Sequence, residues 1–563
     1  MKNLIQIILA SLSVVLVLAC EKSKTTNPML QKETVKGDVV EDRAPADGNW
    51  FIKDSTLDKL EGVGSERAQK EFSLKNQREI VVAVIDSGVD ISHEDIKNKI
   101  WNNPGEMGLD SLGIDKKSNG IDDDLNGYVD DIHGWNFIGA KDGRPISFET
   151  LEITRESLRY DKKIANGEVL GEEEKIYFEK INEEYKKQYK NSENSQKLLS
   201  NFDVKITIAK KILKEKLNFD DNAPEKIDAI VSNDAEVLQA KSDLQEIAKN
   251  FRSIARFYRI YENTKNSLAY FLNKNFNARE IVGDDPSDFT QSQYGNNDVM
   301  GPDASHGTHV SGIIAAESSN GLGIDGVAQN VKIMVLRVVP NGDERDKDIF
   351  MAVNYAVKNG AQIINMSFGK EFSPSKEKLD EAFSAAAEKG VLLFHSAGNG
   401  ASNNDVTVGY PNRHVLNSVV KKLPEQISTW LEIGASAQYR GLKMVAPFSD
   451  YGKKDVDFFS PGYEMKSSVP GNQYAVFSGT SMASPAAAGV GALLMSNFDS
   501  MTAQQAKAIL IHESRLYVDL MVHLPGNQAL DLPVPFAQLS ATGGVIDAYK
   551  SIKFARELTN EVK

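Results

Sequence analysis

The stretch QYAVFSGTSMASPAAAGVGALLM, residues 473–495, changes character at its middle. A short apolar run ends at Ser478 and Gly479, and a segment of small residues that tolerates Pro485 near its start follows. This pattern predicts a strand, a turn and then a helix whose first turn carries Ser481. The unpaired N–H groups and positive dipole end of a helix N-terminus would stabilise an oxyanion beside Ser481. Taken alone, such composition more often marks a Gly/Ser turn that leads into a buried, Ala-rich helix.

Two other segments make the functional interpretation of this stretch more specific. VVAVIDSGVD (residues 81–90) and SHGTHVSG (residues 305–312) precede GTSMASP (residues 479–485) in the chain. In this order the three segments resemble the Asp, His and Ser signature boxes of the subtilisin-like serine peptidases. The resemblance implies a serine endopeptidase that hydrolyses peptide bonds through an acyl-enzyme, without a cofactor for catalysis. The catalytic residues that it implies are Asp86, His306 and Ser481.

The apolar pattern predicts the sheet on which such a site depends. Residues 80–85 are consecutively apolar and end at Asp86, which is typical of a central parallel strand buried on both faces. Open α/β sheets place their chemistry at the carboxyl ends of such strands. A carboxylate without a partner is costly there, and the resemblance names His306 as the partner.

After His306, apolar runs alternate with helical stretches that stop at Gly360 and Gly390. This alternation predicts an α/β fold with a mostly parallel central sheet and helices on both faces. The predicted strands occupy residues 332–339, 362–368, 391–394, 431–436 and 456–462. The predicted helices occupy residues 346–359 and 377–389, and a capping box of Thr502 and Gln505 predicts one more.

Loops that follow the predicted strands add binding residues under the resemblance. SAGNG resembles the box in which Asn399 donates a hydrogen bond to the oxyanion and Gly398 lies beside the substrate. An Asn in a Gly-rich loop is otherwise typical of a turn. NMSFG resembles the segment whose Ser367 and Gly369 pair with the main chain of an extended peptide. The acidic loop at residues 340–348 corresponds to the opposite wall and predicts tolerance for basic substrate residues.

The segment NGIDDDLNGYVDD, residues 119–131, holds five aspartates. Its oxygen donors have the offsets of a calcium loop with Gly127 at the sharp turn, which predicts a structural calcium site. His133 stands where an EF-hand has Glu, so a true EF-hand is not expected. A solvated acidic turn is the alternative interpretation. The predicted ligands are Asp122, Asp124, Asn126, the carbonyl of Tyr128 and Asp130.

The distance between the first two boxes predicts an additional subdomain. His306 follows Asp86 by 220 positions, and much of this gap is charged and helical in character. Apolar residues at three-four spacing predict one long amphipathic helix over residues 244–261. We expect a helical insertion over residues 147–281. Its role stays open between a separately packed surface element and a lid, an exosite or an intramolecular inhibitor.

The N-terminal region predicts export. Residues 1–19 begin with a positive charge and continue as an apolar run that is short for a membrane span, ending before Cys20, the only cysteine. The pattern over residues 1–20 resembles a bacterial lipoprotein signal, whose cysteine carries the lipid. An ordinary secretory signal with an incidental cysteine is the alternative. We therefore expect a protein of the bacterial cell envelope, lipid-anchored to a membrane, exposed outside the cytoplasm and without an intrachain disulfide.

The remaining boundaries follow from composition. Residues 21–47 are polar and lack apolar periodicity, which predicts a flexible tether. The peptidase domain is expected at residues 48–146 and 282–563, on either side of the insertion. The net charge of -14, without a basic stripe, argues against nucleic acid as a partner. The expected partners are polypeptide substrates and a membrane that is reached through the N-terminal lipid.

Two rival functions stay open. A catalytically silent surface lipoprotein of the same fold would bind peptides, although the full set of Asp86, His306, Asn399 and Ser481 speaks against it. A metal-dependent hydrolase would use His306, His309 and the aspartate loop, because two histidines three residues apart can share one helix face. No HExxH pattern accompanies that pair, and the resemblance makes His309 structural.

Overall fold

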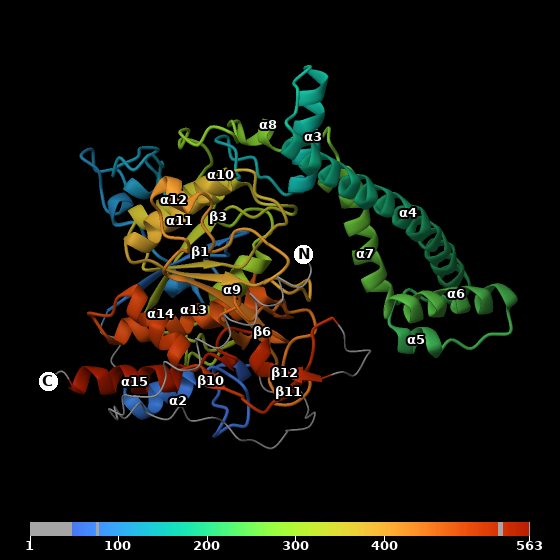
Figure 1. Cartoon of the computed structure of the whole chain (residues 1–563). Helices are drawn as coiled ribbons and strands as arrows, with labels where there is room; N and C mark the ends of the chain where they lie inside the picture. The colour runs from blue at the N-terminus through green and yellow to red at the C-terminus, as the bar shows by residue number, and fades with distance from the viewer. Residues whose placement is uncertain (1–47, 75–77, 527–532, 562–563) are drawn as a thin grey trace, which may run out of the picture. The chain divides into compact units, whose positions relative to one another are not determined.

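The computed structural model describes residues 48–74, 78–526 and 533–561 (Figure 1). The predicted signal peptide, the lipid-bearing Cys20 and the predicted tether lie outside these residues. None of the helices in the described ranges combines the length and the apolar composition that crossing a bilayer requires.

A nine-stranded sheet is the centre of the described chain, in the order β10-β13-β7-β6-β5-β4-β1-β3-β2. Neighbouring strands run parallel except for the pair of β10 and β13. This arrangement confirms the mostly parallel sheet that the alternating pattern predicted. The strands are β1 (Ile80–Asp86), β2 (Gly134–Asn136), β3 (Val331–Arg337), β4 (Ile363–Met366), β5 (Leu392–Ser396), β6 (Trp430–Ser436), β7 (Phe458–Pro461), β10 (Arg515–Leu516) and β13 (Gly544–Val545).

Helices cover both faces of this sheet, and the residues of β1 show why (Figure 1). Val82 and Val84 contact the layer that contains α9 and α13, whereas Ala83 and Ile85 contact the layer that contains α10 and α11. Because both faces are buried, the strand is apolar at every position instead of at every second one. These helices are α9 (Ser305–Ala315), α13 (Thr480–Asn497), α10 (Asp346–Lys358) and α11 (Lys376–Glu388).

Shorter elements complete the body of the chain. Two antiparallel hairpins lie outside the main sheet, and the capping box predicted for Thr502 and Gln505 is confirmed by two reciprocal hydrogen bonds of 3.2 and 3.0 Å. The remaining helices are α2 (Ser65–Phe72), α12 (Ser418–Lys421), α14 (Ala503–His512) and α15 (Ala548–Glu561). The hairpin strands are β8 (Met465–Val469) with β9 (Gln473–Phe477), and β11 (Met521–His523) with β12 (Pro533–Pro535).

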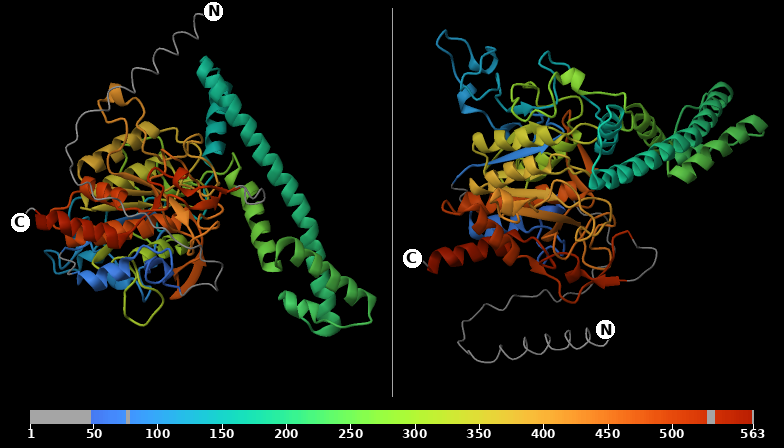
Figure 2. Two further views of the ribbon diagram at one scale, coloured as in Figure 1. Left: turned by 60° about the horizontal axis from the view of Figure 1, so that its bottom comes forward. Right: turned by 45° about the horizontal axis from the view of Figure 1, so that its top comes forward.

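The helical insertion is confirmed as a run of helices between β2 and α9 (Figures 1 and 2). The 46-residue α4 carries it away from the sheet, about 70 Å at 1.5 Å per residue. A small core made only of insertion residues, including Leu213, Leu244 and Phe257, packs α4 against α6 and α7. The helices are α3 (Glu152–Ala165), α4 (Glu172–Leu217), α5 (Pro224–Asp228), α6 (Ala235–Phe251), α7 (Ile254–Asn266), a π-helical turn at Ser267–Phe271 and α8 (Arg279–Val282).

The single long helix predicted over residues 244–261 is wrong. Arg252 has a φ of 66°, in the left-handed region that ends a helix, so α6 stops there. The Ser253 hydroxyl then accepts a hydrogen bond from the N–H of Arg256 (3.0 Å) and caps α7. The apolar spacing continues through the break because both helices face the same small core.

Candidate active site

Three neighbouring strands of the sheet end at the candidate site. β1 ends at Asp86, β4 ends just before Ser367, and β5 ends three residues before Asn399. β5, β4 and β1 lie side by side and run parallel, so their carboxyl ends meet at one edge of the sheet. The fold therefore brings together predicted residues that are more than 300 positions apart in the chain.

Asp86 and His306 are in direct contact. His306 is the second residue of α9, and its Nδ1 lies 2.8 Å from Oδ1 and 3.0 Å from Oδ2 of Asp86. The Asp86 side chain is buried, and its Oδ1 also accepts a hydrogen bond from the N–H of Ser87 (2.7 Å). Since an ionised carboxylate only accepts, Nδ1 of His306 carries the proton and Nε2 is left as an acceptor.

The charge around His306 changes its acidity. Burial lowers the pKa of His306, but the attraction of Asp86, the hydrogen bond to Asp86 and the attraction of Asp303 together outweigh burial. The pKa of His306 therefore lies above its ordinary value. The His306 side chain is 37% exposed, so it can be reached from solvent.

Ser481 is the second residue of α13, which confirms the predicted start of that helix. Its hydroxyl donates to the carbonyl of Ser367 (3.1 Å), and the hydroxyl of Ser367 donates to the carbonyl of Ser481 (2.9 Å). Within the described residues this hydroxyl makes no hydrogen bond to His306. Turning it to another partner needs one rotation about its Cα–Cβ bond, which takes picoseconds to nanoseconds for an accessible side chain.

Asn399 lies on the exposed loop after β5, next to the start of α13. Its Oδ1 accepts hydrogen bonds from the N–H (2.9 Å) and the hydroxyl (3.1 Å) of Thr480. This orientation turns the amide nitrogen away from Thr480 and leaves it as a donor. The preceding Gly398 has a φ of 114°, and a Cβ there would come within 2.1 Å of Oδ2 of Asp450, so the loop requires glycine.

Two cavities meet at this site. The first, of about 440 Å³, is lined by Ser481, and the second, of about 490 Å³, is lined by His306. Both cavities share four lining residues, so the cavity lined by Ser481 adjoins the cavity lined by His306. The shared residues are Ser367, Phe368, Gly369 and Asn399.

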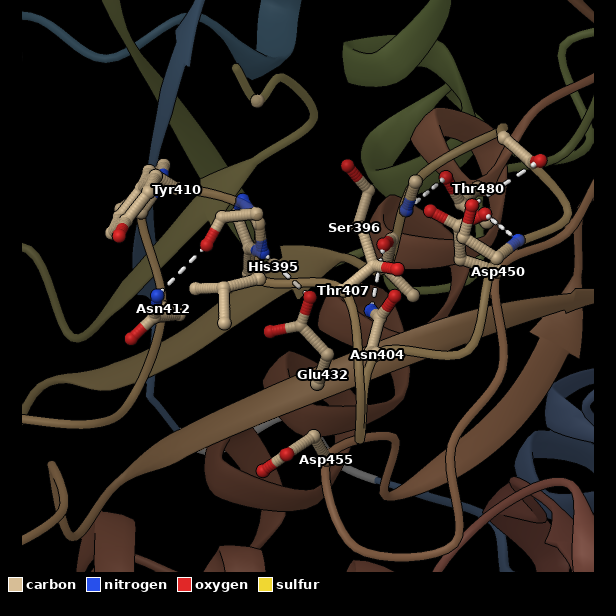
Figure 3. A pocket seen from close by; sticks show the side chains of 18 of the residues that line it. His395, Ser396, Asn404, Thr407, Tyr410, Asn412, Glu432, Asp450, Asp455 and Thr480 are labelled. Atoms are coloured by element: carbon tan, nitrogen blue, oxygen red, sulfur yellow. Dashed lines mark hydrogen bonds and ion pairs between the residues drawn. The ribbon is translucent and has the colours of Figure 1, made fainter. Parts of the chain in front are cut away.

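The first cavity has a polar floor that sequence reasoning missed (Figure 3). His395 of β5 is buried, with Nδ1 2.8 Å from Oε1 of Glu432 and Nε2 2.9 Å from the carbonyl of Phe368. The indole N–H of Trp430 donates to the other oxygen of Glu432 (2.7 Å). A His and a Glu inside otherwise apolar strands were the signal that could have found this group, because buried polar residues need partners.

The acidic loop at residues 340–348 does not offer free negative charge. Asp346 lies 2.7 Å from the Lys370 ammonium, and Asp348 lies 2.8 Å from the Arg279 guanidinium. Glu344 is also buried. The predicted tolerance for basic substrate residues therefore loses its basis, because these acids are already paired or withdrawn from the surface.

His309 is placed for packing. It is fully buried, its ring stacks on Phe477, and Nε2 donates to the carbonyls of Met465 (3.0 Å) and Ala475 (3.2 Å). Burial lowers the pKa of His309 to about 3, so the ring is neutral at physiological pH. In the described part of the chain, the side-chain group with metal-binding spacing does not include His306 or His309.

The aspartate loop differs from the predicted ligand arrangement. Asp122 accepts hydrogen bonds from the N–H groups of Asn126 (3.0 Å) and Gly127 (2.7 Å), and Asp130 accepts from the N–H of Gly120 (3.1 Å). Tyr128 packs its ring against Trp135 and Tyr355. Among the described residues, the carboxylates with metal-binding spacing, within 4.8 Å of one another, are those of Glu106, Asp124 and Asp131. Asp124 is the one member of the predicted set in this group.

Within the described part of the chain, no ion pair involves Glu106, Asp124 or Asp131, the three residues of this acid cluster. Burial raises the pKa of Glu106 to about 7 and that of Asp131 to about 6. Asp131 is satisfied by Asn103, Asn126 and Tyr355. Glu106 is fully buried, and its Oε2 has no hydrogen-bond partner among the residues that the structure describes.

Comparison with known proteins adds the following similarities. A family model described as the subtilase family matches residues 77–532. The chain is 35% identical to "Thermophilic serine proteinase" of Bacillus sp. (strain AK1), over 42% of this chain and 56% of that protein. It is 32% identical to "Major intracellular serine protease" of Bacillus subtilis (strain 168), over 46% of this chain and 76% of that protein. It is 34% identical to "Subtilisin DY" of Bacillus licheniformis, over 36% of this chain and 67% of that protein.

Proposed function

We propose that this chain, which belongs to the subtilase family, is a serine endopeptidase that cleaves polypeptides through an acyl-enzyme on Ser481. The observation that carries the proposal is the imidazole of His306 held by both oxygens of Asp86, beside a cavity that adjoins the one lined by Ser481. The family supports polypeptides as the substrate class.

The proposed reaction begins with a proton transfer. Asp86 fixes the imidazole with Nδ1 protonated, so Nε2 of His306 takes the proton of Ser481 as the hydroxyl attacks the peptide carbonyl. The hydroxyl leaves its hydrogen bond with Ser367 to do so, since apo geometry commonly tightens only in the substrate complex. The same imidazolium then gives its proton to the leaving amine, and water hydrolyses the ester by the reverse route.

Two donors would stabilise the oxyanion. The N–H of Ser481 lies in the first turn of α13 and so has no acceptor within that helix, and the amide nitrogen of Asn399 faces away from Thr480. Ser367, Gly369 and Gly398 would hold the substrate main chain beside these donors.

One labelling experiment tests the proposal. We expect a fluorophosphonate to label the native protein covalently, and we expect no label on Ser481→Ala. A native protein that stays unlabelled but binds peptides would favour the catalytically silent alternative. Loss of peptide hydrolysis in chelator, together with indifference to the fluorophosphonate, would favour the metal-dependent alternative.

We further propose that Glu106, Asp124 and Asp131 hold a structural calcium ion. Support comes from the spacing of their carboxylates and from the buried, unpartnered Oε2 of Glu106. Calcium prefers several carboxylate oxygens and would supply the positive charge that this cluster lacks. This ligand set replaces Asp122 and Asp130, whose carboxylate oxygens already accept hydrogen bonds from backbone N–H groups of the loop.

We also propose that the chain is an envelope lipoprotein anchored through Cys20. The support is the sequence alone: a positive start, a short apolar run and a single cysteine at its end. An exported peptidase without a disulfide is consistent with stabilisation by a bound cation.

A further inference from the structure

The candidate substrate cleft has two walls, and the start of the helical insertion contacts the first wall and the residue that directly follows the second. One wall is residues 339–342, the other is residues 367–369, and they line the same cavity as His306. Asn341 exchanges two backbone hydrogen bonds with the segment that leads into α3, to Ser147 (3.0 Å) and from Glu149 (2.8 Å). The insertion therefore begins with a segment that forms one parallel β-bridge, between Phe148 and Asn341, with the first wall.

Lys370 links the insertion to the second wall. It follows Gly369 directly, its side chain is fully buried, and its backbone exchanges two hydrogen bonds with Tyr410 (2.8 and 2.9 Å) on the rim of the first cavity. Its ammonium lies 2.7 Å from Oε2 of Glu152 in α3, 2.7 Å from Oδ1 of Asp346 and 2.9 Å from the carbonyl of Glu344. One buried cation thus joins α3 of the insertion to two chain segments: the one that directly follows the second wall and the one that directly follows the first.

A buried ammonium makes this link stiff. Burial alone lowers the pKa of Lys370, but Glu152 and Asp346 outweigh it and raise the pKa above its ordinary value, so the side chain stays charged. Moving any one segment away would leave a buried charge without its partner, which is strongly unfavourable. The three segments are therefore held at a fixed separation as long as the cation is present.

A second set of contacts joins the insertion to residues 343–345, which directly follow the first wall. Arg155 of α3 donates to the carbonyls of Asp343 (3.1 Å) and Glu344 (3.2 Å), and the N–H of Glu152 donates to Oδ2 of Asp343 (2.7 Å). Arg345 pairs with Glu149 at 2.7 Å. Gly342 lies so close to this segment that a Cβ would come within 2.1 Å of the Glu149 carbonyl.

The C-terminal end of the insertion is held by a different buried lysine, which provides a matched control for Lys370. Lys347 is also a fully buried lysine, and its ammonium lies 2.7 Å from Oδ2 of Asp284 and 2.7 Å from the carbonyl of Asp285. Arg279 pairs with Asp348 beside it. None of these residues lines either cavity of the candidate site.

We propose that Lys370 is a positioning residue through which the helical insertion sets the separation of the two substrate-binding walls. The insertion then takes part in substrate selection. Substrate residues before the scissile bond pair with both walls, and the insertion determines how much that pairing raises kcat/KM. This proposal rests on the proposed peptidase function, because it assigns those walls to an extended substrate. It also replaces the open choice among lid, exosite and inert surface element with a mechanical role for the base of the insertion.

The test compares two substrates that share one leaving group. A tetrapeptide amide would contact both walls, whereas a single acylated residue would occupy the first cavity, which residues 339–342 of the first wall do not line. In Lys370→Met we expect kcat/KM for the tetrapeptide to fall about tenfold more than for the single residue, because small misplacement of a bound substrate is costly. Lys370→Arg, which keeps the charge, should restore most of the difference, and Lys347→Met should leave the ratio of the two substrates as in the native protein.

Other results would overturn the proposal. Equal losses on both substrates in Lys370→Met, or the same change of ratio in Lys347→Met, would mean that Lys370 only stabilises the fold. If Lys370→Met does not fold, Glu152→Gln tests the same link, and an unchanged ratio there overturns it. Binding of a fluorescent tetrapeptide to Ser481→Ala, with and without Lys370→Met, gives a readout without turnover. If the peptidase assignment is wrong, the native protein will hydrolyse neither substrate. If only this proposal is wrong, Lys370→Met will leave tetrapeptide binding to Ser481→Ala unchanged.

Discussion

Nδ1 of His306 lies between the two carboxylate oxygens of Asp86, at 2.8 and 3.0 Å, although 220 residues separate them in the chain. The chain reverses its course several times between the two residues, through β2 and the whole helical insertion, and still returns α9 to the end of β1. This contact fixes which ring nitrogen is protonated, and the predictions about catalysis follow from it.

The pH dependence of turnover should report the raised pKa of His306. Neutral His306 is the proposed base, so kcat/KM should rise with pH through that pKa, with a midpoint above the ordinary value of about 6.5. Asp303→Asn removes one of the charges that raise the pKa and should move the midpoint to lower pH. Asp142→Asn, at an exposed acid paired with Arg144, should not move it. A flat profile from pH 5 to 9 would contradict the assignment.

Loss of the side-chain oxyanion donor should slow chemistry without weakening binding. Asn399→Ala should lower kcat by about 10²–10³, the size that such a donor has in a subtilisin, with little change in KM. Asn404→Ala, which loses a bond to the Ala397 carbonyl in the same loop, is the control for loop damage. Similar losses in both variants would assign Asn399 to turn formation instead.

Calcium should stabilise the fold through Glu106. A ligand that binds only the folded state and is present at 100 times its Kd raises the free energy of unfolding by about 2.7 kcal/mol. The thermal midpoint should therefore be higher in excess calcium than in chelator. Glu106→Gln should abolish this difference, and Asp130→Asn, whose carboxylate holds the turn at Gly120, should retain it. Identical midpoints for the native protein in calcium and in chelator would refute the site.

Without calcium, the same carboxyl should make stability fall with rising pH. Burial raises the pKa of Glu106 to about 7, above its unfolded value near 4.5, so the folded state binds the extra proton between these values. The contribution of this group to the free energy of unfolding is therefore highest below about pH 4.5 and declines up to about pH 7. Denaturant midpoints measured in chelator from pH 5 to 8 should show a decline that is smaller in Glu106→Gln.

The distal core of the insertion should unfold independently of the active site. Phe257 is fully buried in a cluster whose members all come from the insertion, so Phe257→Ala should destabilise that part by about 3–5 kcal/mol. Faster hydrogen exchange in α4, α6 and α7, with unchanged hydrolysis of a single-residue substrate, is the expected result. Loss of that hydrolysis would mean that the distal core and the site unfold together.

Lipid attachment should depend on one residue. Cys20→Ala should abolish incorporation of a labelled fatty acid and release the chain from the membrane fraction, while Cys20→Ser serves as a second, near-isosteric variant. Retention of label in either variant would exclude Cys20 as the attachment point.

The sequence by itself determined the α/β class with its mostly parallel sheet and the presence of a helical insertion, and it marked the candidate site residues. These features depend on local pattern: the apolar run before Asp86, the Gly/Ser turn before Ser481 and the alternation after His306 are read within a few residues. Local pattern did not find the end of α6 at Arg252, because the apolar spacing continues across the break.

Only the tertiary structure decided which charges meet. Asp348 and Asp346 of the acidic loop pair with Arg279 and Lys370, which come from other segments. The carboxylates of Glu106, Asp124 and Asp131 lie within 4.8 Å of one another, although 25 positions separate the first from the last. A charge acts over a few ångströms in a low-dielectric interior, and its partner can lie anywhere along the chain. The role of a buried ion such as Lys370 is therefore set by the packing of distant segments, which no local pattern encodes.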